Sequence, residues 1–130
     1  MNRMFISRPR HDKGTNYLFA WSKSVIMFAE ERGWIVDKSD GLRVTSSEVS
    51  SKLAKNPANF VFFNGHGSSE MICGHDDEIL VQAGKNEAIL RGLVVYALSC
   101  SSAKILGLVS VEAGAIAYIG YTEDFIFFRS

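Results

Sequence analysis

The stretch FVFFNGHGSS, residues 60–69, decides the fold of this chain. Its first four residues are apolar without polar alternation, which is the pattern of a strand buried on both faces. Such strands belong to parallel sheets that helices cover on both sides. The run then gives way to glycines around His66, just past the carboxyl end of the expected strand. Ligands and catalytic groups gather at that edge of a parallel sheet.

A second stretch, VVYALSCSS at residues 94–102, has the same design. Cys100 follows its buried run as His66 follows the first one. If a right-handed crossover makes the two strands neighbours, their ends lie about 5 Å apart. We therefore expect His66 and Cys100 to face one another over one cleft.

Around these stretches, the apolar pattern alternates between strand and helix. Pro9 ends the first strand, Thr15 or Asn16 caps the first helix, Gly33 ends that helix and Ser102 caps the last one. This order predicts an α/β fold with a mostly parallel sheet, helices on both faces and a β-hairpin insertion. The expected strands are residues 4–7, 34–36, 60–63, 93–98 and 115–119, the helices are 15–32, 46–54, 86–90 and 102–109, and the hairpin is 70–81 with a polar turn at 74–77.

Composition narrows the classes of function. The 130 residues suit one domain, 1–130, and 47% hydrophobic with 22% charged residues is ordinary for a globular protein. Lysine plus arginine equals aspartate plus glutamate at 14 each, whereas nucleic-acid binders concentrate positive charge. No run approaches the roughly 20 apolar residues of a membrane span, and no signal peptide is visible. Two cysteines are too few for a disulfide framework, so we expect a cytoplasmic protein with reduced thiols and neither nucleic-acid nor membrane partners.

The residue types at the two strand ends suit nucleophilic catalysis. Amide groups at the start of a helix directly after Cys100 would stabilise its thiolate. A neighbouring imidazole, His66, can take the thiol proton and later protonate the leaving amine. The backbone N–H groups of Gly67 and Cys100 could form an oxyanion hole.

At these residues the chain resembles the caspase-like cysteine peptidases, the clan of caspases, gingipains, clostripain, separase and the CHAT domains. The likeness rests on GHGS at residues 65–68 and ALSCSS at 97–102, and it is closest to the gingipain and CHAT branches. Those branches similarly carry a Gly-x-Asp hairpin, here 74–76, and a Gly-Ala-x-Ala-x-Ile-Gly strand, here 114–120. The resemblance implies a three-layer caspase-like sandwich acting on peptide or protein substrates without a cofactor. By position, His66 is its catalytic histidine, Cys100 its nucleophile and Gly67 an oxyanion donor.

Two further expectations follow from the resemblance. Several clan members hold a basic P1 side chain with an acidic residue, and Glu123 and Asp124 follow the last expected strand, which favours Arg or Lys over Asp at P1. Family domains usually continue with another helix and strand, whereas this chain ends after the apolar run 125–128. We expect a truncated domain or processed subunit, completed by a missing C-terminal segment, a regulatory domain or a second copy at its open sheet edge.

Other interpretations compete with this one. A lone histidine beside glycine is usually a turn residue, and a lone cysteine is usually packing. Cys73, His75, Asp76 and Asp77 suggest a metal site, but a Cys-x-His pair on one hairpin supplies two zinc ligands at most, so we expect a solvated turn and no metal.

His11 and Asp12 are expected to be loop residues. The rival function is a catalytically silent caspase-like module that binds partner proteins through its apolar edge. A nucleotide-binding domain is a third class, disfavoured because the Gly-x-Gly around His66 lacks the further glycine, lysine and hydroxyl of a phosphate loop.

Overall fold

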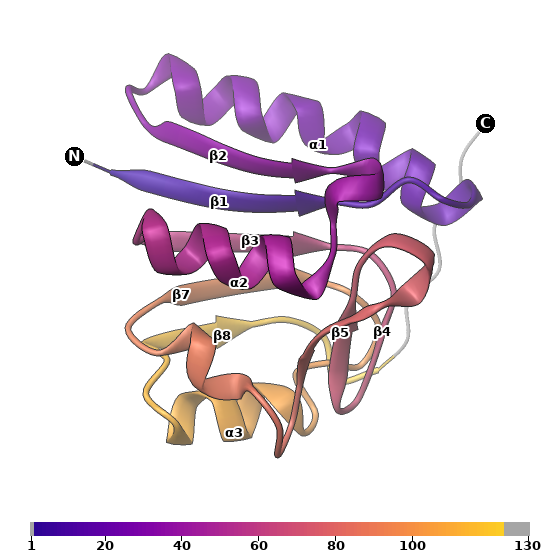
Figure 1. Ribbon diagram of the computed structural model, residues 1–130, viewed down its shortest axis with the longest axis vertical. Helices are drawn as coiled ribbons and strands as arrows, with labels where there is room; N and C mark the ends of the chain where they lie inside the picture. Colours follow the sequence, from indigo (N-terminus) through magenta and orange to yellow (C-terminus); the bar gives the residue numbers. More distant parts are fainter. Residues whose placement is uncertain (1, 124–130) are drawn as a thin grey trace.

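The computed structural model describes residues 2–123. Within that range the main sheet has five strands in the order β2-β1-β3-β7-β8, and every neighbouring pair is parallel (Figure 1). Asp124 and the apolar run 125–128 lie outside the described residues. The strands are β1 (Arg3–Arg8), β2 (Ile35–Asp40), β3 (Phe60–Asn64), β7 (Val94–Leu98) and β8 (Ala117–Ile119).

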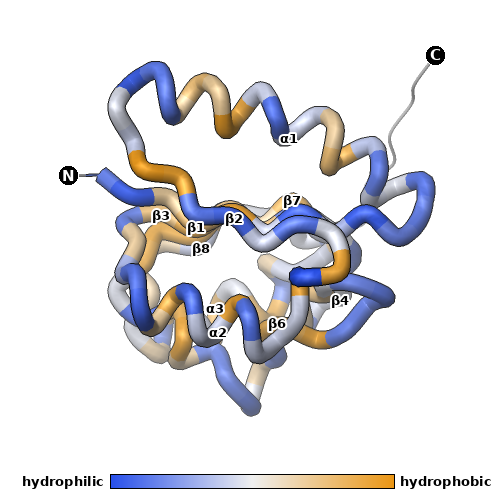
Figure 2. The backbone as a smooth tube through the Cα atoms, turned by 45° about the horizontal axis from the view of Figure 1, so that its top comes forward, coloured by the Kyte–Doolittle hydropathy of each residue, from blue (hydrophilic) through white to orange (hydrophobic). Residues whose placement is uncertain are grey.

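Helices cover both faces of this sheet and make three layers. Helix α1 (Lys13–Glu31) lies on one face, and α2 (Ser46–Lys55) and α3 (Leu106–Glu112) lie on the other (Figure 2). Alternate side chains of a strand point to opposite faces. Phe62 packs with Leu18 of α1, whereas Phe63 belongs to the opposite core with Val49 of α2. The expected α/β architecture with a parallel, doubly covered sheet is confirmed.

A small antiparallel sheet follows β3. It consists of β4 (Gly67–Ser68), β5 (Met71–Cys73) and β6 (Ile79–Gln82), in that order. The β5–β6 hairpin is the expected insertion, and its turn contains the 3-10 segment η2 (His75–Asp77). Strand β4 was not expected, because two residues are too few to show an alternating pattern. The small sheet stands at the carboxyl edge of the main one (Figure 1).

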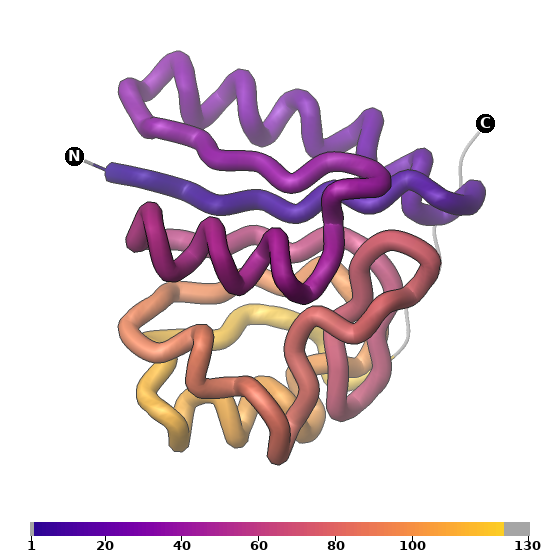
Figure 3. The backbone as a smooth tube through the Cα atoms, in the orientation of Figure 1, coloured from indigo at the N-terminus to yellow at the C-terminus, as the bar shows by residue number. Residues whose placement is uncertain are grey.

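Strand register brings three loops to that edge. Asn64 of β3 pairs with Leu98 of β7, so His66 and Cys100 each follow a paired residue by two positions. On the other side of β3, Ser7 of β1 pairs with Phe63. The segments that follow β1, β3 and β7 all turn away from the sheet at this edge (Figure 3).

The last helix begins later than expected. Helix α3 starts at Leu106, and Ser102 does not cap it. Ser102 is fully buried, and its Oγ accepts hydrogen bonds from the Tyr118 hydroxyl at 2.8 Å and from Ser99 Oγ at 3.1 Å. Burial raises the pKa of Tyr118 to about 12, although the bond to Ser102 opposes the rise, so the hydroxyl remains a donor. These buried hydrogen bonds occupy the Ser102 hydroxyl, which the sequence analysis expected to cap the last helix.

The first helix also begins differently. Its N-cap is Asp12, whose Oδ1 accepts the Thr15 backbone N–H at 2.9 Å. Thr15 Oγ1 accepts the Asp12 backbone N–H at 3.0 Å and completes a capping box. Thr15 is therefore a residue of the first helical turn that bonds back to the N-cap. The expectation of Thr15 or Asn16 as N-cap is wrong. Gly33, with φ of +82°, follows the end of α1 as expected.

Smaller differences concern element lengths. Strand β2 is longer than expected, and the expected helix at 86–90 is the 3-10 segment η3 (Glu87–Leu90). A further 3-10 segment, η1 (Gly41–Arg43), precedes α2. Among the described residues, no helix has the length and apolar character needed to cross a membrane.

The buried face of β3 gives a stability prediction. Phe63 is fully buried, whereas Phe28 on α1 is 57% exposed. We expect Phe63→Ala to lower the free energy of unfolding by about 3–5 kcal/mol, because it leaves a cavity in the core. The control Phe28→Ala should cost about 1 kcal/mol or less. Urea unfolding measures both; equal losses would contradict the central position of β3.

Candidate active site

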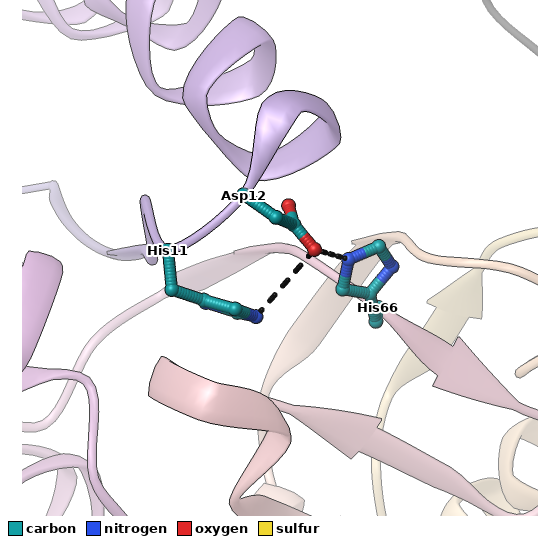
Figure 4. Close-up of side chains that lie close together, drawn as sticks. All are labelled: His11, Asp12 and His66. Carbon is teal, nitrogen blue, oxygen red and sulfur yellow. Dashed lines mark hydrogen bonds and ion pairs between the residues drawn. The ribbon is translucent and has the colours of Figure 1, made fainter.

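His66 and Asp12 form a short polar contact at the carboxyl edge. His66 Nε2 lies 2.6 Å from Asp12 Oδ2, and the two side chains come from the loops after β3 and β1 (Figure 4). The distance is that of a charge-assisted hydrogen bond. Both side chains keep contact with solvent, at 45% and 42% exposure. This pair is therefore accessible to a substrate or ligand.

Asp12 is ionised at neutral pH. Partial burial acts to raise its pKa, but hydrogen bonds from the Thr15 backbone, from His66 and from the Thr15 hydroxyl outweigh burial and lower the pKa to about 2. An ionised carboxylate only accepts hydrogen bonds, so Nε2 of His66 carries the proton. In the neutral ring Nδ1 is then the basic nitrogen, and it lies on the side of the ring away from Asp12 (Figure 4).

Sequence reasoning missed Asp12 and treated it as a loop residue. One signal was present: Asp-x-x-Thr at residues 12–15 is compatible with a capping box, which places Asp12 at the start of α1. That signal does not reveal the partner of the carboxylate. The contact with His66 requires β1 beside β3, which a single sequence does not specify.

Cys100 lies in a loop that is fastened to the His66 loop. The carbonyl of Ser69 accepts the backbone N–H groups of Ile105 at 3.1 Å and Leu106 at 2.9 Å. At Gly67, a Cβ atom would lie 2.9 Å from Ser99 Cβ, closer than such atoms come, so only glycine fits there. The two loops are therefore in direct contact, as expected for segments that follow neighbouring strands.

The expected helix start directly after Cys100 is wrong. Helix α3 begins only at Leu106, whose N–H donates to the Ser69 carbonyl. The loop instead has Ser101 in the left-handed region, with φ of 57°, a conformation that costs about 1–2 kcal/mol. The Ser101 N–H donates to the Glu123 carbonyl at 3.2 Å, and the Lys104 N–H donates to the Ser101 carbonyl at 3.0 Å. These bonds hold the loop in that shape.

Glu123 lies beside the Cys100 loop, as the bond to Ser101 shows, and it is exposed. The same segment also holds the loop through the Tyr121 carbonyl, which accepts the Ala103 N–H at 2.9 Å. Asp124, the second expected specificity residue, is outside the described range.

The two thiols differ in their surroundings. Cys73 is 6% exposed, and burial, together with the charge of Asp77, raises its pKa to about 11. Cys100 is half-buried. A thiol reacts through its thiolate, so Cys73 is protected both by burial and by protonation.

All three histidines of the chain gather near this edge. The His11 ring lies 5.8 Å from the His66 ring and 5.7 Å from the His75 ring, between centroids. His11 Nε2 is 3.2 Å from Asp77 Oδ1. The turn at 73–77 is only partly the solvated one expected, because Asp76 and Asp77 are exposed but Cys73 is buried and His75 half-buried. Its neighbour His11 comes from a different loop, which spacing along the hairpin could not show.

No protein-family model matches the chain, and no curated protein matches it. Function is therefore inferred from the residues themselves. A thiol, an imidazole and an ionised carboxylate on three adjacent loops are the groups that nucleophilic acyl transfer needs.

The burial of the thiols predicts selective alkylation. In the folded protein at about pH 7.5, iodoacetamide should modify Cys100 first, and Cys73 should react only after unfolding in denaturant. Intact mass spectrometry with peptide mapping measures this order. Cys100→Ser should remove the fast phase and Cys73→Ser should leave it intact; fast reaction at Cys73 would contradict the described burial.

The pKa of Asp12 predicts a pH-dependent contribution to stability. The folded value of about 2 lies below the ordinary 3.8, so the contribution is complete above 3.8 and is lost as pH falls through 2. Asp12→Asn keeps the cap acceptor and removes the charge. We expect the gap in unfolding free energy between wild type and Asp12→Asn to shrink as pH falls from about 5 to about 2. Urea unfolding across that range measures the gap, and a constant gap would sink the prediction.

Proposed function

We propose that this chain is a caspase-like cysteine peptidase domain that hydrolyses peptide bonds through Cys100, with His66 as acid and base and Asp12 as positioning residue. One observation carries the proposal: the 2.6 Å contact of His66 Nε2 with Asp12 Oδ2, at the edge where the Cys100 loop is fastened to the His66 loop. The resemblance at residues 65–68 and 97–102 supports the same class.

The reaction proceeds by acyl transfer to the thiol. His66 Nδ1 takes the proton of Cys100 Sγ, and the thiolate adds to the substrate carbonyl carbon. The backbone N–H groups of Gly67 and Cys100 donate to the oxyanion. When the C–N bond breaks, the imidazolium returns its proton to the leaving amine and a thioester remains. Water then gives a proton to the same imidazole and adds to the thioester carbonyl carbon. The C–S bond breaks, the acid product leaves, and the imidazolium returns its proton to the Cys100 thiolate.

Asp12 keeps His66 in the tautomer that this reaction needs. Its carboxylate accepts the Nε2 proton, which leaves Nδ1 as the base, and it stabilises the imidazolium that forms during attack. The capping box with Thr15 holds the carboxylate from the other side. Asp12 therefore acts through His66 and does not itself exchange a proton with the substrate.

We further propose a preference for Arg or Lys at P1. The position of Glu123 beside the Cys100 loop supports it, because an exposed carboxylate there would attract a basic side chain near the scissile bond. Asp124 is the second candidate for this role. The substrates are accordingly peptides or proteins with exposed basic residues.

A second candidate is a catalytically silent caspase-like module that binds proteins. The observation in its favour is the exposed apolar surface at the β8 edge, where Ile116 is 67%, Ile119 50% and Leu108 of α3 64% exposed. Open strand edges pair readily with other chains. A regulatory domain or a second copy of the chain would pair with that edge.

Active-site labelling tests the proposal. We expect a P1-Arg acyloxymethyl ketone peptide to form a covalent adduct at Cys100, faster than its P1-Asp counterpart. Cys100→Ala and His66→Ala should abolish the adduct, and Asp12→Asn should slow it by about 10²-fold or more, because the ring loses its tautomer. The matched control Asp76→Asn, on the exposed turn, should label like wild type.

Intact mass spectrometry at several times gives the labelling rates. If the adduct forms at the wild-type rate in both His66→Ala and Asp12→Asn, the proposal that His66 and Asp12 assist the Cys100 thiol is refuted. An unlabelled but folded protein would favour the binding module. Faster labelling by the P1-Asp peptide would overturn the basic preference alone.

A further inference from the structure

His11 is a buried imidazole that the proposed reaction does not use. Its side chain is 9% exposed, and its Nε2 lies 3.2 Å from Asp77 Oδ1 and 3.8 Å from Asp12 Oδ2. Among the described residues its Nδ1 has no hydrogen-bond partner. Its Nε2 therefore faces the carboxylates of two different loops.

His11 stands with Asp12 and His66 in metal-binding geometry. One ligand atom from each lies within 4.8 Å of the others. Asp12 Oδ2 is 2.6 Å from His66 Nε2 and 3.8 Å from His11 Nε2. Tetrahedral zinc with bonds of about 2.0–2.1 Å places its ligand atoms about 3.3 Å apart. The first separation must open by about 0.7 Å and the second must close by about 0.5 Å. The ligand atoms of the two histidines, which lie within 4.8 Å of each other, must also come to about 3.3 Å.

Thr15 already orients two of the three ligands. Its backbone N–H and hydroxyl both donate to Asp12 Oδ1, at 2.9 and 2.8 Å, which leaves Oδ2 directed at the histidines. Thr15 Oγ1 also accepts the backbone N–H of His11 at 2.9 Å. Outer hydrogen bonds of this kind position metal ligands and raise affinity.

We propose that Zn²⁺ binds to His11 Nε2, Asp12 Oδ2 and His66 Nε2, with water as fourth ligand, and switches off the Cys100 thiol chemistry. Two imidazoles and one carboxylate suit zinc, whereas Ca²⁺ and Mg²⁺ prefer oxygen ligands throughout. The metal displaces the proton from His66 Nε2, and the neutral ring then carries its single proton on Nδ1. Nδ1 can no longer accept the thiol proton. This regulatory consequence rests on the proposed peptidase function; the metal site does not.

The structure offers a competing set, His11 with His75 and Asp76. We favour the first set because Thr15 fixes the Asp12 carboxylate, whereas the Asp76 side chain is 76% exposed on a turn. The two sets share His11 and differ in the second histidine. Substitution of His66 or His75 therefore tells them apart.

Isothermal titration with Zn²⁺ tests the site in a Cys100→Ser background, where the thiol cannot act as ligand. We expect one ion per chain, with affinity at least about tenfold weaker in His11→Ala, His66→Ala and Asp12→Asn. The control His75→Ala should bind like its parent, and Ca²⁺ and Mg²⁺ should give no binding. Asp12→Asn retains the helix cap, so it decides the question even if the buried His11 variant does not fold.

Absence of Zn²⁺ uptake, uptake unchanged by His66→Ala, or uptake lost in His75→Ala would each overturn the site.

The regulatory half is tested by labelling Cys100 in wild type with the P1-Arg peptide. Zn²⁺ should slow the labelling of Cys100 at least about tenfold, and EDTA should restore the original rate. In His11→Ala, Zn²⁺ should leave the labelling rate unchanged. If the labelling rate stays the same while zinc is bound, the proposed inhibition by zinc is overturned. If Cys100 stays unlabelled without metal, the proposed peptidase fails, and the titration still decides the metal site.

Discussion

Backbone hydrogen bonding of β3 to β1 on one side and to β7 on the other sets where Asp12, His66 and Cys100 lie. Parallel strands end at the same edge, so the loops after these three strands must emerge together. Those loops carry Asp12, His66 and Cys100, the three side chains of the proposed peptidase site. A slip of one residue in either pairing would exchange the side chains that β3 presents to the two helical layers, so packing against both layers enforces the register.

Around that edge, small residues let the loops approach closely enough to share hydrogen bonds. Gly67 touches Ser99 where no Cβ fits, and Ser69 accepts two amides from the end of the Cys100 loop. Ser102 and Tyr118 secure the same loop from the core. The loop shape is held by many short contacts to neighbouring strands, and a helix start at the cysteine plays no part.

His66 belongs to both the proposed peptidase site and the proposed metal site. In the proposed peptidase the contact with Asp12 orients His66 as a base, and in the proposed metal site the same atoms, together with His11, are the ligands. A proton and a metal ion compete for one nitrogen, Nε2, and the outcome decides whether Nδ1 is basic. The ionised state of Asp12 serves both arrangements, because a carboxylate accepts a hydrogen bond or binds a cation equally well.

The sequence by itself determined the α/β class, the positions of the buried strands, the hairpin after β3, and the placement of His66 and Cys100 at one edge. Continuous apolar runs and the residues that interrupt them are local signals, so they are legible without a structure. Tertiary structure decided the partner of His66, the place of His11 and the start of α3. Asp12 reaches His66 only because β1 pairs with β3. Ser102 does not cap a helix as expected, because its hydroxyl bonds to Tyr118. Such choices depend on contacts between residues far apart in the chain, which propensity and spacing do not encode.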